Sequence, residues 1–167
     1  MVGINNLFMI FETIQKELEA HSFVIVSKDH SRPWGGFFVI IEHQAQQFAN
    51  QYFEGLNVSS LKISGQLSPK ILVVAPGKRL SWQYHYRRAE IWRVIKGQVG
   101  VKRSKDDTEG ELEILNVGDT ITLQQGERHR LIGLDDYAVI AEIWQHTDAD
   151  HPSDEDDIVR VQDDFGR

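Results

Sequence analysis

The chain reads Gly77-Lys-Arg-Leu-Ser-Trp-Gln-Tyr-His-Tyr-Arg-Arg-Ala-Glu90, with Gly97 following, and later Gly118-Asp-Thr-Ile-Thr-Leu-Gln-Gln-Gly-Glu-Arg-His129. Gln83 and His85 are two positions apart, so on a β-strand both side chains leave the same face. Glu90 follows five positions later, and His129 comes after a turn marked by glycine. One amide, two imidazoles and one carboxylate that converge would form a mixed nitrogen and oxygen site for a divalent metal, with positions left open for a substrate.

The spacing of these residues resembles the two motifs of the cupin family, Gly-x5-His-x-His-x4-Glu-x6-Gly and Gly-x5-Pro-x-Gly-x2-His. Two positions differ, because Gln83 stands where many cupins have their first His, and Gln124 stands where the second motif has Pro. The resemblance implies an all-β core with the double-stranded β-helix, or jelly-roll barrel, of the cupins. It also implies a metal site on Gln83, His85, Glu90 and His129.

The residues around the first motif resemble one cupin family in particular, the type II phosphomannose isomerases. The stretch from Ser81 to Trp92 is similar to that family's Ser-Leu-Gln-x-His-x-x-Arg-(Ala/Ser)-Glu-His-Trp, in which Gln is the expected first ligand. Further family motifs are matched, in the right order, by Arg32-Pro-Trp-Gly35, His129-Arg-Leu131, Glu155-Asp-Asp-Ile-Val-Arg160 and Asp163-Asp-Phe-Gly-Arg167. The resemblance covers about residues 32–167.

The chain also departs from that family near the expected site. The replaced positions are Tyr86, Arg87 and Ile91, which are often His, Gly133-Leu134 in place of Asn-Pro, and Trp144 in place of Gln. An inserted stretch separates Gly35 from the first metal motif. These changes lie where a sugar would be recognised, so the metal site is carried over and the sugar is left open. An enzyme that acts on another phosphorylated sugar, such as a heptose phosphate, would show the same pattern.

The resemblance implies a metal-dependent aldose–ketose isomerase that converts mannose-6-phosphate to fructose-6-phosphate by proton transfer through an enediolate. One divalent ion per chain would act as a Lewis acid. Zinc is expected first, with manganese, cobalt, nickel or iron as alternatives. Phosphate oxygens would be bound by cationic side chains, of which guanidinium groups bind them bidentately. The candidates are Arg88, Arg130, Arg160, Arg32 and Lys70.

Glu142 is the candidate base. It is a carboxylate within the otherwise apolar run Val139-Ile-Ala-Glu-Ile-Trp144. Burial near the mouth of the barrel would raise its pKa toward the operating pH, as a general base requires. The alternative is that Glu142 faces outward or pairs with an arginine.

Two other functions stay open. An iron-dependent cupin oxygenase would also use imidazole and carboxylate ligands, although Gln83 and the arginine-containing C-terminal motifs favour the isomerase. A non-catalytic sugar- or metal-binding cupin is the second alternative, and the replacements at Tyr86, Ile91 and Trp144 favour it. Ketose formation from phosphorylated aldoses would separate these functions.

Composition predicts one soluble domain. The chain has 167 residues, of which 26% are charged and 41% hydrophobic, as in ordinary globular proteins. The absence of cysteine excludes disulfide and thiolate chemistry and fits a cytoplasmic protein. The apolar run at residues 7–11 is too short to span a membrane. Because no basic stripe indicates nucleic acid, the expected partners are a phosphorylated sugar and a second copy in a homodimer.

Periodicity predicts how the chain is divided. Residues 1–60 are expected to form a helical extension packed on the barrel, with helices at residues 6–20 and 45–53. Residues 61–167 are expected to form the barrel and an acidic C-terminal segment. Turn signals there separate eight predicted strands: Lys70–Ala75, Leu80–Tyr86, Glu90–Lys96, Val99–Arg103, Glu111–Leu115, Thr120–Leu123, Arg128–Ile132 and Tyr137–Gln145.

The net charge of −7 is concentrated at the C-terminal end of the chain. From Thr147 onward there are eight acidic residues and two arginines. Acidic runs are usually solvated. Here the apolar residues Ile158, Val159, Val161 and Phe165 interrupt the run, which favours a segment that docks on the barrel.

Overall fold

The computed structural model describes residues 4–61 and 66–167. In chain order the elements are α1 (Ile4–Ala20), β1 (Ile25–Arg32), β2 (Gly35–Ile40), η1 (Glu42–Gln44), α2 (Ala45–Tyr52), η2 (Val58–Ser60), β3 (Lys70–Val74), β4 (Trp82–Tyr84), β5 (Arg88–Lys96), β6 (Gln98–Ser104), β7 (Glu113–Asn116), β8 (Thr120–Leu123), β9 (Arg128–Gly133), β10 (Ala138–His146) and β11 (Val159–Gln162). Each of the eight predicted strands is present, with bounds that differ by two residues at most.

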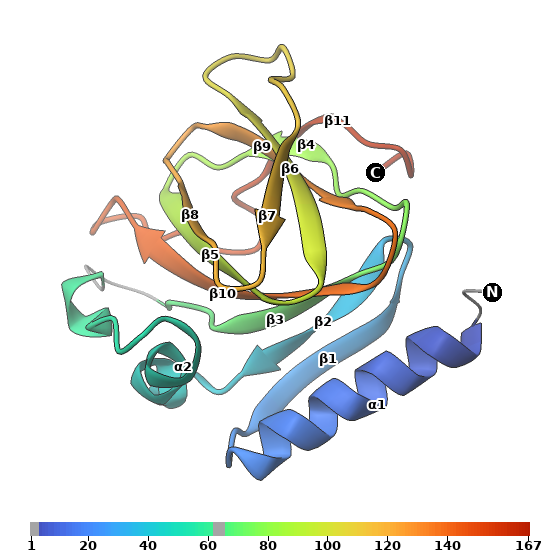
Figure 1. The fold of residues 1–167 in the computed structure, drawn as a ribbon. Coiled ribbons are helices and arrows are strands. Elements are labelled where there is room, and N and C mark those ends of the chain that lie inside the picture. Colours follow the sequence, from blue (N-terminus) through green and yellow to red (C-terminus); the bar gives the residue numbers. More distant parts are fainter. Residues whose placement is uncertain (1–3, 62–65) are drawn as a thin grey trace.

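Two antiparallel sheets face each other and form a barrel (Figure 1). One sheet has the order β1-β2-β3-β10-β5-β8, and the other has the order β11-β4-β9-β6-β7. Successive strands from β3 to β6 and from β7 to β10 alternate between the two sheets. This is the jelly-roll architecture of the cupins, so the predicted fold class is confirmed.

The barrel interior is filled by one apolar cluster drawn from both sheets. Trp92 and Val94 of β5 and Ile140 of β10 meet Val101 and Leu131 from the opposite sheet. Because strand side chains alternate between faces, residues in register with this cluster also point into the barrel. Glu90 and Glu142, two positions from Trp92 and Ile140, are therefore carried to the inner side.

A second apolar cluster lies on the outer face of the six-stranded sheet. Phe11 and Leu18 of α1 and Phe48 of α2 pack there against Ala141 and Ile143 of β10. Figure 1 shows both helices on this side of the molecule, outside the barrel. Strand β10 is consequently buried on both faces along almost its whole length. The prediction of helices packed outside the barrel is confirmed.

Residues 25–40 form two strands where the sequence pattern indicated none. β2 pairs with β3, and β1 pairs with β2 at the edge of the sheet. The β1 sequence is mostly polar and exposed, so it lacks the apolar alternation by which a strand is recognised. Gly35 permits the close approach of β2 to β3, since a Cβ atom there would lie 2.0 Å from the carbonyl oxygen of Val73. The N-terminal region therefore contributes strands as well as helices.

The acidic C-terminal segment docks on the barrel. β11 pairs with β4 so that Arg160 lies opposite Gln83. Arg79 holds the end of the segment through Asp164, with Nε to Oδ2 at 2.5 Å. The segment is thereby placed beside the strand that carries the first predicted metal ligand.

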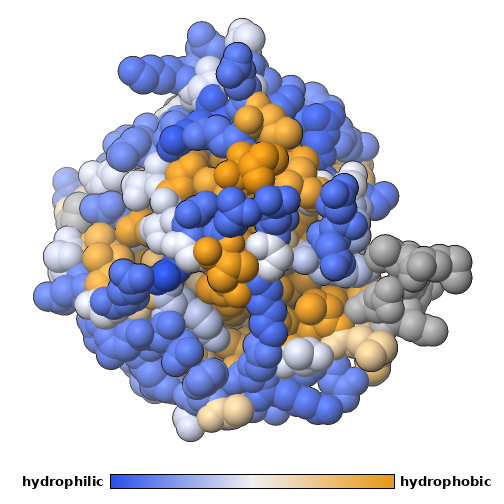
Figure 2. All heavy atoms as spheres, viewed as in Figure 1, coloured by the Kyte–Doolittle hydropathy of each residue, from blue (hydrophilic) through white to orange (hydrophobic). Residues whose placement is uncertain are grey.

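Hydrophilic residues dominate the surface in Figure 2, with hydrophobic residues gathered near the centre of the view. Leu112, Ile114 and Val117, on and beside β7, are among the exposed large apolar side chains. β7 is an edge strand of its sheet, and its outer face has no covering element among the described residues. None of the described helices combines the length and the apolar character needed to cross a membrane.

Candidate metal centre

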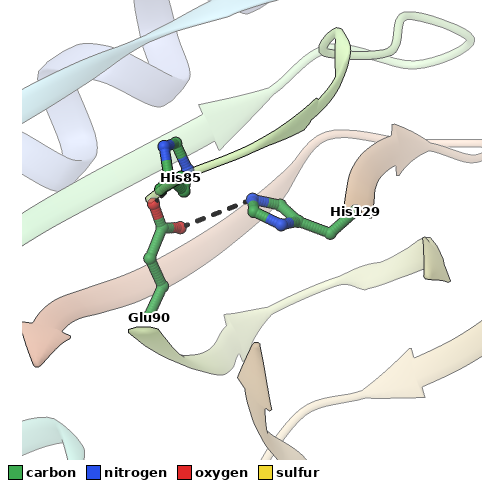
Figure 3. Close-up of side chains that lie close together, drawn as sticks. All are labelled: His85, Glu90 and His129. Atoms are coloured by element: carbon green, nitrogen blue, oxygen red, sulfur yellow. Dashed lines mark ion pairs between the residues drawn. The ribbon is translucent and has the colours of Figure 1, made fainter. Parts of the chain in front are cut away.

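Three strands bring the predicted ligands together. Gln83 is in β4 and lies opposite His129 of β9 in the sheet register. His85 directly follows β4, and Glu90 comes from β5 of the other sheet. The ligand atoms of His85, Glu90 and His129 lie within 4.8 Å of one another, and all three residues are buried (Figure 3).

The carboxylate of Glu90 lies between the two imidazole rings (Figure 3). Its Oε1 is 2.9 Å from Nε2 of His85, and its Oε2 is 3.8 Å from Nε2 of His129. Two imidazole nitrogens and a carboxylate oxygen form a donor set used by catalytic zinc and other divalent ions.

In both rings a backbone carbonyl binds Nδ1, and Nε2 is the nitrogen that faces Glu90. Nδ1 of His85 lies 2.6 Å from the carbonyl oxygen of Asp157, and Nδ1 of His129 lies 3.0 Å from that of Glu127. A carbonyl oxygen only accepts, so both Nδ1 atoms carry the proton, and each Nε2 has a lone pair.

Nε2 of His129 is buried without a hydrogen-bond partner among the described residues. Leaving a buried polar atom unpaired costs about 1–3 kcal/mol. A divalent cation at this point would satisfy that nitrogen, which is the physical reason that the residues fit a metal.

The protonation states of His129 and Glu90 both suit metal ligands. Burial lowers the pKa of the His129 imidazole to about 4, so the ring is neutral at pH 7. Burial alone would raise the pKa of Glu90. The contacts of Glu90 with His85 and the positive charge of Arg88 outweigh it and hold the pKa of Glu90 well below its usual range. Arg88 also donates from Nε to Oε1 of Glu90 at 3.1 Å.

Gln83 lies next to this group rather than within it. Its side chain is half-buried and faces the same pocket as Glu90. Its Oε1 accepts a hydrogen bond of 2.5 Å from the hydroxyl of Ser81, which orients the amide. The role of Gln83 as the fourth ligand stays a prediction.

A pocket open to solvent lies beside the candidate metal ligands. Most of the predicted site residues line it, namely Gln83, Glu90, Glu142, Arg32, Lys70, Arg88 and Arg160. Aromatic and apolar side chains form other parts of its wall: Trp34, Phe37, Leu72, Leu80, Trp92 and Ile158. Cationic groups, buried carboxylates and a hydrophobic wall therefore surround one cavity.

Glu142 faces this pocket and not the outside of the barrel. Its side chain is buried, and it accepts hydrogen bonds from the indole nitrogens of Trp92 at 2.9 Å and Trp144 at 3.0 Å. Burial, reinforced by the charge of Glu90, raises the pKa of Glu142 to about 7. Of the two orientations left open by the sequence, the inward one is observed.

Arg130 is placed elsewhere, and its predicted role in phosphate binding requires correction. It does not line the pocket. Its side chain is buried on the other face of β9, where it bonds to the Leu80 carbonyl at 2.8 Å and to Glu109 at 2.9 Å, and also to Gln162. The reason is strand alternation, since His129 next to it points inward. Arg130 therefore anchors the loop that carries Glu109 and the C-terminal segment that carries Gln162.

Three further residues of the site were not singled out by the sequence. Arg167 lines the pocket, and Glu155 lines it while pairing with Lys70 at 2.7 Å. Asp157 supplies the carbonyl that holds His85. The match of the C-terminal residues to a family motif was the available signal for Arg167. Glu155 and Asp157 lie in the matched stretch from Glu155 to Arg160, which was the available signal for both.

Among the departures at Tyr86, Ile91 and Trp144, it is Trp144 that contacts a side chain lining the pocket. Tyr86 is 58% exposed, and Ile91 belongs to the outer cluster beneath the helices. Trp144 instead contacts the candidate base through its indole nitrogen. The ring of Trp144 also stacks against Arg88, whose guanidinium carbon is 3.8 Å from the ring centroid.

Comparisons with known proteins agree with these features. Residues 42–163 match the family described as mannose-6-phosphate isomerase C-terminal. The mannose-1-phosphate guanylyltransferase of Salmonella montevideo is 27% identical over 151 residues, which are 90% of this chain and 26% of that protein. ManC of Salmonella typhimurium, with the same activity in its name, is 33% identical over 59% of this chain and 19% of its own length. The chain thus spans about a quarter or less of these relatives.

Solved structures resemble the chain in fold. The capsular polysaccharide assembling protein CapF of Staphylococcus aureus superimposes with a TM-score of 0.51 at 14% identity, over 83% of this chain and 34% of that chain. Tomato vicilin superimposes with a TM-score of 0.52 at 16% identity, over 79% of this chain and 32% of its own. At these identities the likeness concerns the architecture alone.

Proposed function

Because this chain belongs to the mannose-6-phosphate isomerase C-terminal family, we propose that it is a metal-dependent aldose–ketose isomerase acting on a phosphorylated sugar. The reaction proposed first is mannose-6-phosphate to fructose-6-phosphate. One observation carries the proposal: two buried carboxylates, Glu90 and Glu142, line one pocket, and their surroundings move their pKa values in opposite directions. Two carboxylates whose pKa values are shifted apart can take separate roles, one as an ionised ligand and the other as a base.

Glu90 is the ligand of the pair. Together with Gln83, His85 and His129 it would hold the metal. The metal, when bound, would supply Lewis-acid polarisation of the sugar oxygens. Zinc is proposed first, and manganese, cobalt, nickel and iron would suit the same donors.

Glu142 is the base of the pair. Isomerisation moves a proton between C1 and C2 of the sugar, and a carboxylate with a pKa of about 7 can both take up and return that proton. The indole N–H groups of Trp92 and Trp144 each engage one carboxylate oxygen and fix its direction. Each oxygen retains a further lone pair for the substrate.

The sugar phosphate would be held at the rim of the pocket. Arg32 and Arg160 are exposed there, so their guanidinium groups can reach a phosphate dianion. Lys70 lies deeper and is paired with the exposed Glu155, which a phosphate could replace as its partner. Arg88 is already bonded to Glu90, Ser153 and the Asp154 carbonyl, so it is better suited to holding the site than to binding phosphate.

A non-catalytic sugar-binding cupin is the second candidate, and Trp144 favours it. This bulky ring stands where the resembled family has Gln, directly against the proposed base. An iron-dependent oxygenase has less support, since a pocket rim with several cationic side chains has no use in that chemistry.

Incubation of the protein with mannose-6-phosphate and other phosphorylated aldoses, followed by a ketose assay, tests the proposal. Ketose formation that requires the divalent metal and is lost in Glu142→Gln would support the isomerase. Sugar phosphate binding without any ketose, in metal-loaded protein, would support the non-catalytic function.

A further inference from the structure

Asp157 in the C-terminal segment makes four hydrogen bonds around the first histidine ligand. Its carboxylate accepts the backbone N–H groups of Tyr86 at 2.9 Å and Arg87 at 3.0 Å, and the hydroxyl of Ser153 at 2.6 Å. Its carbonyl accepts Nδ1–H of His85 at 2.6 Å. Asp157 is itself buried, so these bonds are shielded from water and are geometrically restrictive.

The chain around His85 lacks the usual support of a sheet. Residues 85–87 lie between the end of β4 and the start of β5. The two consecutive N–H groups that follow His85 are held by one carboxylate, 71 and 70 residues further along the chain. Asp157 thus accepts the backbone hydrogen bonds that a neighbouring strand would otherwise accept, at the point where the chain leaves the sheet after His85.

The same residue reaches a second ligand through a chain of hydrogen bonds. The Ser153 hydroxyl donates to Asp157 and accepts from Nη1 of Arg88 at 2.9 Å. Arg88 in turn donates from Nε to Glu90. Two of the three clustered ligands are therefore oriented by contacts that begin in the C-terminal segment.

We propose that Asp157 is the positioning residue of the metal centre, which couples docking of residues 153–167 to the tautomer and direction of His85. The inference rests on the metal site of the proposed function and not on the isomerase reaction. Outer contacts of this kind typically change metal affinity by about 10- to 100-fold. Because coupling between two equilibria is reciprocal, bound metal stabilises the docked segment by the same factor.

The test compares Asp157→Asn with Asp156→Asn in Zn²⁺ binding, measured by competition with a chromophoric chelator. Asn keeps the shape of Asp but brings an NH₂ group against backbone donors. Asp156 is the exposed neighbour, so its substitution removes the same charge without touching His85. We expect about 10- to 100-fold weaker Zn²⁺ binding for Asp157→Asn, and unchanged binding for Asp156→Asn.

Two further measurements separate positioning from simple stability. Nitrogen NMR of the metal-free protein should find the proton of His85 on Nδ1, and a mixture of tautomers in Asp157→Asn. Hydrogen exchange at the amides of Tyr86 and Arg87 should slow when Zn²⁺ is added to the unchanged protein. A purely structural residue would lower the melting temperature and leave both the His85 tautomer and Zn²⁺ affinity as they were.

Ser153→Ala keeps the inference testable should Asp157→Asn not fold. It removes the bridge to Arg88 and leaves the two backbone bonds of Asp157 in place, so Zn²⁺ binding should weaken less. Failure of the unchanged protein to bind Zn²⁺ would overturn the metal centre as a whole. Zn²⁺ binding by folded Asp157→Asn that is as tight as in the unchanged protein, with His85 still protonated on Nδ1, would overturn this inference alone.

Discussion

Glu142 lies directly opposite Trp92 in the register of β10 against β5, and its Oε2 accepts the indole N–H of Trp92 at 2.9 Å. The same indole nitrogen lies 3.1 Å from Oε2 of Glu90. One donor therefore connects the proposed base to a proposed metal ligand. Two buried carboxylates therefore lie close together, and their different surroundings shift their pKa values in opposite directions.

Removal of either histidine should remove the metal. The purified protein is expected to carry about one divalent ion per chain, because three donors converge on one point. His85→Ala and His129→Ala should each lose the ion and the activity, as measured by elemental analysis and the ketose assay. His43→Ala, at an exposed position on η1, serves as the control. A metal-free native protein with fully active histidine variants would contradict the site assignment.

Glu142→Gln should separate proton transfer from binding. The amide keeps the size of the carboxylate but cannot accept the substrate proton, so turnover should fall by about 10²- to 10⁴-fold. Metal content and sugar phosphate affinity should persist. In deuterated water the unchanged protein should label its product at the exchanging carbon. Normal turnover in the variant would exclude Glu142 as the base.

The pH dependence should follow the ionisation of Glu142. A base must be deprotonated, so the rate should fall as the pH drops below about 7. Trp144→Phe removes an N–H that stabilises the charged carboxylate. The pKa should then rise further, and the acidic limb of the rate profile should move to higher pH. A rate that stays constant well below pH 7 would refute this assignment.

Substitution of Arg160 should affect the KM, whereas substitution of Arg130 should affect stability. Arg160→Ala removes an exposed charge at the pocket rim and should raise the KM by about 10- to 100-fold, with little loss of stability. Arg130→Ala should leave the KM unchanged and lower the free energy of unfolding by about 1–3 kcal/mol, because the Leu80 carbonyl loses its donor. Steady-state kinetics and denaturant unfolding would distinguish them. Equal effects of both substitutions on the KM would be evidence against the rim as the phosphate site.

Truncation after Ser153 should disable the protein. The deletion removes β11, which pairs with the strand of Gln83, and the Asp157 contacts to His85. We expect a lower melting temperature together with lost metal and activity, measured by calorimetry, elemental analysis and the ketose assay. Full activity of the truncated chain would show that the acidic segment is dispensable.

Much of this protein could be predicted from local pattern. Turn signals and apolar alternation located the strands from Lys70 to His146, because a half-buried strand repeats every two residues. The same period of two placed Gln83 and His85 on one face. Motif spacing then connected them to Glu90 and His129. The structure brings His85, Glu90 and His129 together.

The remaining features depend on which surfaces meet in three dimensions. β10 is apolar on both faces because α1 and α2 cover its outer side, so its pattern could not show that Glu142 points inward. Arg130 is adjacent to His129 in sequence, but strand alternation sends the two side chains to opposite faces of β9. Asp157 holds His85 across 72 residues of chain, through hydrogen bonds that form only when the C-terminal segment packs against β4. Local geometry determines which residues can share a face, whereas tertiary packing decides which faces are buried and which distant groups become partners.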